Sequence, residues 1–152
     1  MVKKVIFATD FSEASVAAME QVKWLKEKSP ETAVEILHVF NSAALHMPAP
    51  YYFMAEANTW ISEHIEKIRG KAGEALEKAK EEFGGDCTVC LREGKPEQEI
   101  VEYAKESGAD MIVMGTHGLT GLNRWVLGSV AEYVVRHSSC AVLTVRTTEK
   151  DA

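Results

Sequence analysis

Long apolar runs are missing from this sequence, and none reaches the roughly 18 residues that a membrane-spanning helix needs. The chain begins MVKKVIFATD, where the apolar stretch meets Thr9 and Asp10 after only a few residues. A signal peptide would need a longer apolar core and a cleavage site. We therefore expect a first strand rather than a signal peptide, no membrane partner and, by default, a cytoplasmic protein.

An excess of positive charge is also lacking. The chain has 17 Lys and Arg against 23 Asp and Glu, which gives a formal net charge of −6 at pH 7. Proteins that bind nucleic acid usually present a basic face, so DNA and RNA are not expected as partners. The 152 residues, 46% of them hydrophobic, are enough for one ordinary globular domain with a sizeable core.

Cysteine is scarce, and three cysteines are an odd number, so they cannot form a complete set of disulfides. Cys87 and Cys90 have the spacing of redox and zinc motifs, but they lie in the alternating run DCTVCLRE, which is typical of a strand. Residues three apart in a strand point to opposite faces, so the two sulfurs would diverge. We interpret both, and Cys140, as structural residues, and we predict no metal site.

Short apolar runs and helical patterns alternate along the chain. Apolar runs predict strands at residues 3–9, 33–40, 87–93, 110–115 and 141–146. Helical spacing and helix-end signals predict helices at residues 12–29, 56–83, 96–107 and 128–138. In the first helix Ser12 is a natural N-cap, and the apolar residues at helical spacing are Val16, Met19, Val22, Trp24 and Leu25. Whether the second helix is interrupted near Gly70 and Gly73 stays open.

Strands this short and this apolar are buried on both faces, which implies an α/β fold with a parallel sheet and helices on both sides. Open parallel sheets bind ligands at the carboxyl ends of the strands, where the strand order reverses. If the chain winds outward through its first three strands and then returns, the order is 3-2-1-4-5. The ligand crevice would then lie between the first and the fourth strand.

Both of those strand ends carry unusual residues, ATDFS at 8–12 and MGTHG at 114–118. Gly115 and Gly118 would let the backbone turn tightly and bring N–H groups toward a ligand. Gly128 and Ser129 then open a helix, whose free N–H groups and dipole favour an anion. A plain loop before a capped helix is the alternative, and spacing alone does not exclude it.

Asp10 is the natural partner for a ribose, because a carboxylate at a strand end can accept hydrogen bonds from both hydroxyls. It could equally form a turn or cap the helix, and Thr9 and Ser12 have the same ambiguity. Val39, at the end of the second strand, could flank an adenine or simply belong to the core.

The stretch GTHGLTGLNRWVLGSV has glycine, two residues, glycine, nine residues and then glycine-serine. It resembles the nucleotide-binding signature of the universal stress protein family, in its ATP-binding branch. VIFATDFSEAS resembles the first strand and turn of that family, and ILHVF, EIVEYAKESGADMIVMG and AEYVVRHSSCAVLTVR resemble its later segments. The resemblance implies a Rossmann-like domain over residues 1–147 with strand order 3-2-1-4-5, followed by a frayed tail at 148–152. It also implies a homodimer and bound ATP or AMP, and we expect Mg²⁺ only as a companion of ATP.

Carried over position by position, the resemblance implies ten ligand-binding residues: Ala8, Thr9, Asp10, Val39, Met114, Gly115, Gly118, Gly128, Ser129 and Val130. Position 141 is Ala where many members have proline, which could alter the start of the last strand. Residues 41–55 are long and aromatic; they could cover the nucleotide, a subunit surface or only their own core. Arg124 and His117 are interpreted as exposed loop residues, with phosphate contact as the alternative.

Three functions compete at this stage. The leading hypothesis is a stress-response regulator that binds adenine nucleotide, with little or no hydrolysis and an unknown downstream protein partner. A slow ATPase or nucleotidyl transferase on the same scaffold is the second, and a nucleotide-free dimerisation module is the third. In each of them strand 141–146 is an apolar sheet edge, which we expect to pair with a second copy of the chain.

Overall fold

The fold is seen in a computed structural model, which describes residues 1–43, 55–116 and 127–147. Strands and helices alternate as predicted, with ends within two residues of those expected. The elements in chain order are β1 (Lys4–Ala8), α1 (Glu13–Lys28), β2 (Ala33–Phe40), α2 (Ala55–Phe83), β3 (Thr88–Glu93), α3 (Pro96–Glu106), β4 (Met111–Gly115), α4 (Ser129–His137) and β5 (Ala141–Val145). None of these helices has the length and apolarity that crossing a bilayer requires.

The strands form one sheet of order β3-β2-β1-β4-β5 in which every neighbouring pair is parallel. This confirms the α/β fold and the predicted strand order. In the register of the sheet, Ala8 at the end of β1 lies beside Leu37 of β2 and Met114 of β4. β5 begins at Ala141, so alanine at this position does not delay the start of the strand.

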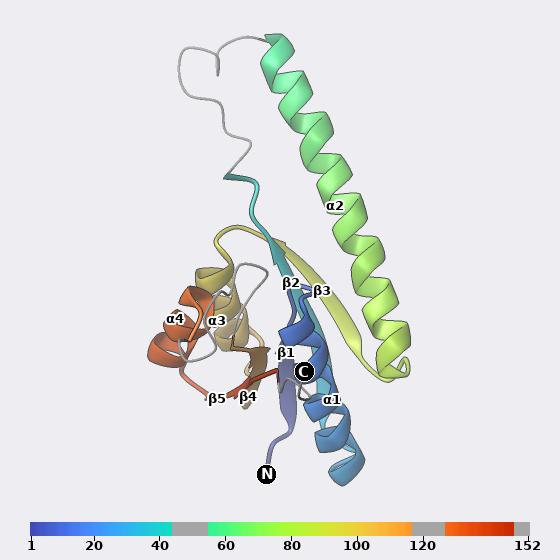
Figure 1. The fold of residues 1–152 in the computed structure, drawn as a ribbon, viewed down its shortest axis with the longest axis vertical. Helices are drawn as coiled ribbons and strands as arrows, with labels where there is room; N and C mark the ends of the chain where they lie inside the picture. The colour runs from blue at the N-terminus through green and yellow to red at the C-terminus, as the bar shows by residue number, and fades with distance from the viewer. Residues whose placement is uncertain (44–54, 117–126, 148–152) are drawn as a thin grey trace, which may run out of the picture.

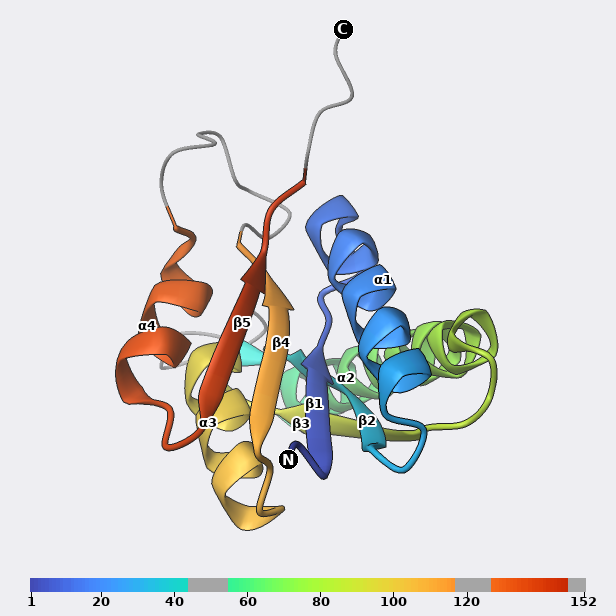
Figure 2. The same cartoon turned by 90° about the horizontal axis from the view of Figure 1, so that it is seen from below.

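Helices cover both faces of the sheet, α1 and α2 on one side and α3 and α4 on the other (Figures 1 and 2). Side chains of β1 alternate between the two resulting cores. Val5 and Phe7 pack against α1 and α2, whereas Ile6 and Ala8 pack against α3 and α4. Cys87 and Cys90 also pack against opposite cores, as the strand interpretation predicted, and all three cysteines are free thiols. Burial raises the pKa of the Cys87 thiol.

The buried face of α1 differs from the one predicted. Val16 and Trp24 are 59% and 53% exposed, so assigning them to the apolar face was wrong. The residues that are buried are Ala14, Ser15, Ala18, Met19 and Val22. The first turn of α1 lies close to the end of β4, since a β-carbon on Gly115 would lie 2.6 Å from Cβ of Ala14. Ser12 is the N-cap as predicted, since its Oγ accepts a hydrogen bond from the Ser15 N–H.

Helix α2 is continuous through Gly70 and Gly73, which settles the question that the sequence left open. Its C-terminal half packs on the sheet through Ala72, Leu76 and Ala79, whereas its N-terminal half extends past the sheet (Figure 1). Arg69 lies where the helix leaves the sheet: its guanidinium pairs with Glu93 of β3 at 3.2 Å and also with Glu66. This ion pair therefore ties the middle of α2 to the carboxyl end of β3.

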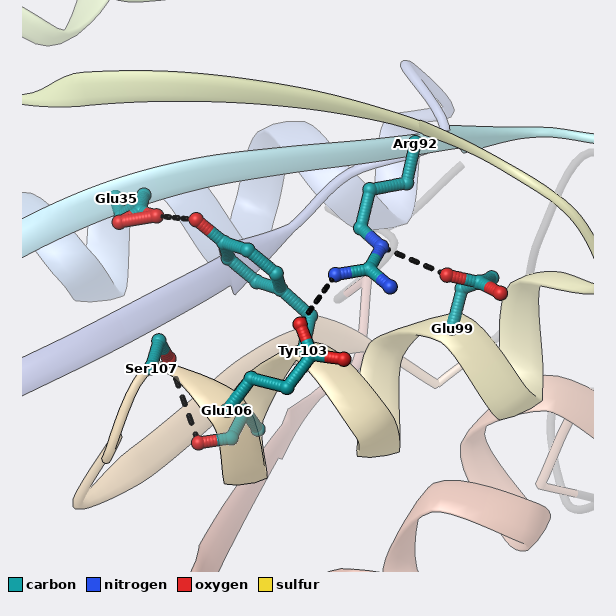
Figure 3. Close-up of polar contacts among 7 residues, drawn as sticks. Glu35, Arg92, Glu99, Tyr103, Glu106 and Ser107 are labelled. Carbon is teal, nitrogen blue, oxygen red and sulfur yellow. Dashed lines mark hydrogen bonds and ion pairs between the residues drawn. The ribbon is translucent and has the colours of Figure 1, made fainter.

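Helix α3 is held against β2 and β3 by a polar network (Figure 3). The Tyr103 hydroxyl donates to a carboxylate oxygen of Glu35, whose side chain is only 12% exposed. Arg92 donates from Nε to Glu99 and from Nη1 to Glu106, at 2.7 Å each, and its guanidinium lies 5.2 Å from the centroid of the Tyr103 ring. Hydrogen bonding to Glu106 raises the pKa of Arg92. Burial, together with the hydrogen bond to Glu35, raises the pKa of Tyr103.

Replacing Tyr103 by Phe keeps the ring and removes the hydroxyl that donates to Glu35. We expect Tyr103→Phe to lower the free energy of unfolding at pH 7 by about 1–2 kcal/mol, because the mostly buried Glu35 carboxylate loses this donor and keeps its ion pair with Lys4 at 3.4 Å. A tyrosine whose pKa is raised in the folded state stabilises the protein fully below the unfolded pKa, near 10, and loses this contribution as the pH rises further. The difference in stability between wild type and variant should therefore shrink above about pH 10.

Urea denaturation at pH 7 and at pH 11 measures this difference. Tyr133→Phe is the matched control, because Tyr133 lies on α4 and stacks on His137 instead. A Tyr103→Phe penalty that is the same at both pH values would contradict the assignment.

Candidate functional site

The strand order reverses between β1 and β4, because β2 continues the sheet on one side of β1 and β4 continues it on the other. Ala8 and Met114 are register partners, and both are buried. The chain therefore leaves the sheet at neighbouring points, after Ala8 of β1 and after Gly115 of β4. The structure thus brings together the two strand ends that the sequence singled out.

The turn after β1 is fixed by hydrogen bonds from inside and outside the turn. The Thr9 N–H donates to the Leu37 carbonyl at 2.9 Å, which extends the β1–β2 ladder by one bond. His38 Nδ1 lies 2.7 Å from the Thr9 carbonyl oxygen. Because a carbonyl only accepts, Nδ1 must carry the proton in this contact. The Thr9 hydroxyl accepts the Phe11 N–H at 3.0 Å.

Phe11 adopts a left-handed backbone conformation, with φ of +63°. A residue with a β-carbon is strained there, and such strain is found most often at functional sites whose surroundings fix the backbone. Two contacts fix Phe11: its N–H bond to Thr9, and its ring, whose centroid lies 4.5 Å from that of His38. The turn is thus a restrained element.

Asp10 forms the turn, which is one of the two roles the sequence left open. Its Oδ1 accepts from the Ser12 N–H at 3.0 Å and from the Ser15 hydroxyl at 2.7 Å. Among the described residues, no hydrogen bond involves Oδ2 of this half-buried side chain. The turn therefore uses one carboxylate oxygen and leaves the other available as an acceptor.

Gly115 is required for a reason that the sequence did not reveal. A β-carbon on Gly115 would lie 2.6 Å from Cβ and 2.9 Å from the carbonyl carbon of Ala14, in the first turn of α1. The missing side chain therefore lets α1 approach the end of β4. Gly118, which was expected to share the turn, lies outside the described residues, as do His117 and Arg124.

The start of α4 is linked to this edge by hydrogen bonds of Thr116, the residue after β4. The buried Thr116 donates its N–H to the Val145 carbonyl at 2.9 Å and accepts the Gly128 N–H at 2.7 Å. Gly128 is the N-cap of α4, no side-chain capping bond is made at this end among the described residues, and the exposed Ser129 is the first residue of the helix. The first N–H groups of a helix have no partners within it, so they are available to an anion.

The apolar site residues meet in a single cluster. Ala8, Val39, Met114 and Val130 all pack in the core between the sheet, α3 and α4. Val39 is 7% exposed and so forms part of this core. Within the described ranges, no group of three or more His, Cys, Asp or Glu side chains could hold a metal ion. The described edge therefore combines apolar strand ends that pack into the core, one carboxylate oxygen and a helix N-terminus.

Comparison with known proteins matches residues 1–146 to the universal stress protein family. The chain belongs to this family. Universal stress protein MJ0531 of Methanocaldococcus jannaschii is 36% identical over 153 residues, which cover 98% of this chain and 85% of the relative. A solved structure of MJ0577, a universal stress protein of the same organism, has a TM-score of 0.84 and 31% identity and covers 99% of both chains.

A universal stress protein family member from Arabidopsis thaliana, solved with AMP bound, shares the fold at a TM-score of 0.57. It is 21% identical, and the match covers 98% of this chain and 94% of that one. The family model and the 36% identical relative confirm the family assignment made from the glycine spacing and the strand segments.

Sequence reasoning missed three residues around the turn of this universal stress protein. Ser15 is a buried serine on the inner face of α1, and the spacing of Asp10, Ser12 and Ser15 could have drawn attention to it. His38 interrupts an otherwise apolar stretch of β2, which was a signal as well. The residue type could not have predicted the positive φ of Phe11, because phenylalanine rarely adopts the left-handed backbone conformation.

Gly115→Ala tests the close approach of α1 to β4. We expect this variant to lose about 1–3 kcal/mol of stability, because the new β-carbon would overlap Ala14. The added change Ala14→Gly should restore only part of the loss, since the contact with the Ala14 backbone remains and glycine weakens a helix. Thermal unfolding of the two single variants and the double variant measures this, and strictly additive losses would contradict the predicted contact.

Proposed function

We propose that this universal stress protein binds an adenine nucleotide, ATP or AMP, at the carboxyl edge between β1 and β4. The observation that carries the proposal is the bonding of the Asp10 carboxylate. One of its oxygens holds the turn, while the other remains an acceptor at the edge. The N-terminus of α4 belongs to the same edge through the bond between Gly128 and Thr116. A ribose acceptor thus adjoins donors suited to phosphate.

The proposed contacts follow from these positions. The adenine lies beside Val39 at the end of β2, Ala8 belongs to the first ligand turn, and Met114 belongs to the loop that holds the ribose and phosphates. Thr9 and Asp10 hold the ribose. Phosphates lie along the glycine-rich segment and the start of α4, on Gly115, Gly118, Gly128, Ser129 and Val130. Relatives of the same fold support the ligand class, since one of them was solved with AMP bound.

We further propose that hydrolysis is slow or absent. Phosphoryl transfer needs positioned charges and a metal ion around the γ-phosphate. Of the proposed contact residues, only Asp10 carries a charge, and its Oδ1 is engaged in the turn. Any Mg²⁺ would therefore be held mainly by the phosphates of ATP. The protein would act as a nucleotide-dependent regulator in the stress response.

Asp10→Asn is the sharpest test of ribose recognition. The amide oxygen of Asn can still accept from Ser12 and Ser15, while the NH₂ group replaces the free acceptor Oδ2. We expect ATP affinity to fall about tenfold or more, as for a lost hydrogen bond to a charged group. Inorganic tripolyphosphate, which has no ribose, should bind Asp10→Asn at least as tightly as the wild type, because the variant removes a negative charge.

Titration calorimetry with ATP, AMP and tripolyphosphate measures these affinities, and ADP release reports hydrolysis. Asp110→Asn is the matched control, because Asp110 lies before β4, at the amino ends of the strands, where it accepts the N–H groups of Lys3 and Lys4. Equal losses for ATP and tripolyphosphate would remove Asp10 from ribose binding. A wild type that binds neither ATP nor AMP would refute the proposed function.

We also propose that the protein is a homodimer through strand 141–146. β5 is an edge of the sheet, and its residues after Ala141 are only half-buried. The Val145 carbonyl accepts a bond from Thr116, so it points toward β4. Because backbone groups alternate along a strand, the N–H and C=O groups of Val142 and Thr144 point to the open side. A two-fold axis would pair these groups with the same groups of a second copy.

Proline at Val142 or Thr144 should weaken this pairing, since proline lacks the N–H group that the second copy would accept. We expect Val142→Pro and Thr144→Pro to shift the protein from dimer to monomer at micromolar concentration. Light scattering gives the mass, and circular dichroism verifies that each variant is folded. A wild type that stays monomeric under the same conditions would exclude the dimer.

A further inference from the structure

The hydroxyl group of Ser15 contacts both the backbone N–H and the side-chain carboxylate of Asp10. Its Oγ accepts the Asp10 backbone N–H at 3.2 Å and donates to Asp10 Oδ1 at 2.7 Å. Ser15 itself is 4% exposed and lies in the first turn of α1, where helix packing fixes it. A buried hydroxyl that holds the backbone and the carboxylate of one residue restricts rotation about the bond between Cα and Cβ of that residue.

Further hydrogen bonds hold Ser15 and the turn in fixed positions relative to each other. The Ser12 N–H donates to the same carboxylate oxygen, Asp10 Oδ1, at 3.0 Å. The Ser12 hydroxyl donates to the Ser15 hydroxyl at 3.4 Å and accepts the Ser15 N–H at 3.3 Å. All these bonds end on Oδ1 or on the serines, and among the described residues none ends on Oδ2. Asp10 is therefore held in one orientation with the same oxygen left over.

We propose that Ser15 is a positioning residue for the nucleotide site: it orients Asp10 before the ligand arrives, so that Oδ2 is presented to the ribose hydroxyls. This inference rests on the proposed function. Ordering a side chain at a binding site costs free energy, and a site ordered during folding does not incur that cost again on binding. The strained backbone of Phe11 fits the same picture, because such strain persists where the surroundings fix the chain.

Ser15→Ala should therefore weaken the binding of ATP about threefold to tenfold, which corresponds to ordering one side chain on binding. The fold should persist, because alanine is a better helix former than serine. 2′,3′-Dideoxy-ATP, which lacks both ribose hydroxyls, should bind wild type and Ser15→Ala equally. Ser15→Thr, which keeps the hydroxyl, should retain most of the ATP affinity.

The experiment is titration calorimetry of both nucleotides on four proteins: wild type, Ser15→Ala, Asp10→Asn and the double variant. If Ser15 acts through Asp10, the effect of Ser15→Ala on ATP should nearly vanish once Asp10 is Asn. Ser107→Ala is the control, because the Ser107 hydroxyl donates to the Ala104 carbonyl at the end of α3, away from the turn. Urea midpoints for all variants verify that they are folded.

Two results would overturn the inference while leaving the proposed function in place. The first is unchanged ATP affinity in Ser15→Ala, in a protein whose wild type prefers ATP over the dideoxy nucleotide. The second is an equal loss for both nucleotides, which would mean that Ser15 only stabilises the fold. A wild type that binds neither nucleotide would instead refute the proposed function, and this inference with it.

Discussion

The burial of β1 on both faces is the constraint on which the rest of this structure depends. Val5, Ile6 and Phe7 are fully buried, and their side chains alternate between two cores. A strand with two apolar faces needs helices on each, so the chain must cross over the sheet in both directions from β1. The strand order therefore reverses between β1 and β4. The segments that follow these two strands diverge to opposite faces of the sheet at its carboxyl edge. The candidate site is a consequence of how the core is built.

Three separate segments complete that edge, and each is attached to the sheet in its own way. The turn after β1 is held by His38 and Ser15, the end of β4 packs on α1 through Gly115, and α4 is joined to β4 through Thr116. These contacts restrict the edge without using Oδ2 of Asp10. A site organised in this way suits a ligand that brings hydroxyl groups and an anion to fixed positions.

Much of this arrangement could be predicted from the sequence, because short apolar runs and helical periodicity reflect two-sided burial and need no knowledge of contacts. The spacing of glycines also led to the correct family. The predictions that were wrong, and the contacts that were missed, depend on how α1 packs against the sheet. Val16 and Trp24 follow helical spacing but are exposed, because the face of α1 that packs on the sheet is the one that carries Ala14, Ser15, Ala18, Met19 and Val22. The role of Ser15 and the requirement at Gly115 arise from contacts between segments that the sequence pattern does not specify.

The central claim is that an adenine nucleotide occupies the edge between β1 and β4. Backbone amide NMR during titration with ATP tests it most directly, because each assigned amide reports its own surroundings. The account predicts that the largest saturable shifts fall on Thr9, Asp10, Gly115, Ser129 and Val130. Shifts that centre on the amino ends of the strands, near Asp110, or the absence of any saturable shift would contradict it.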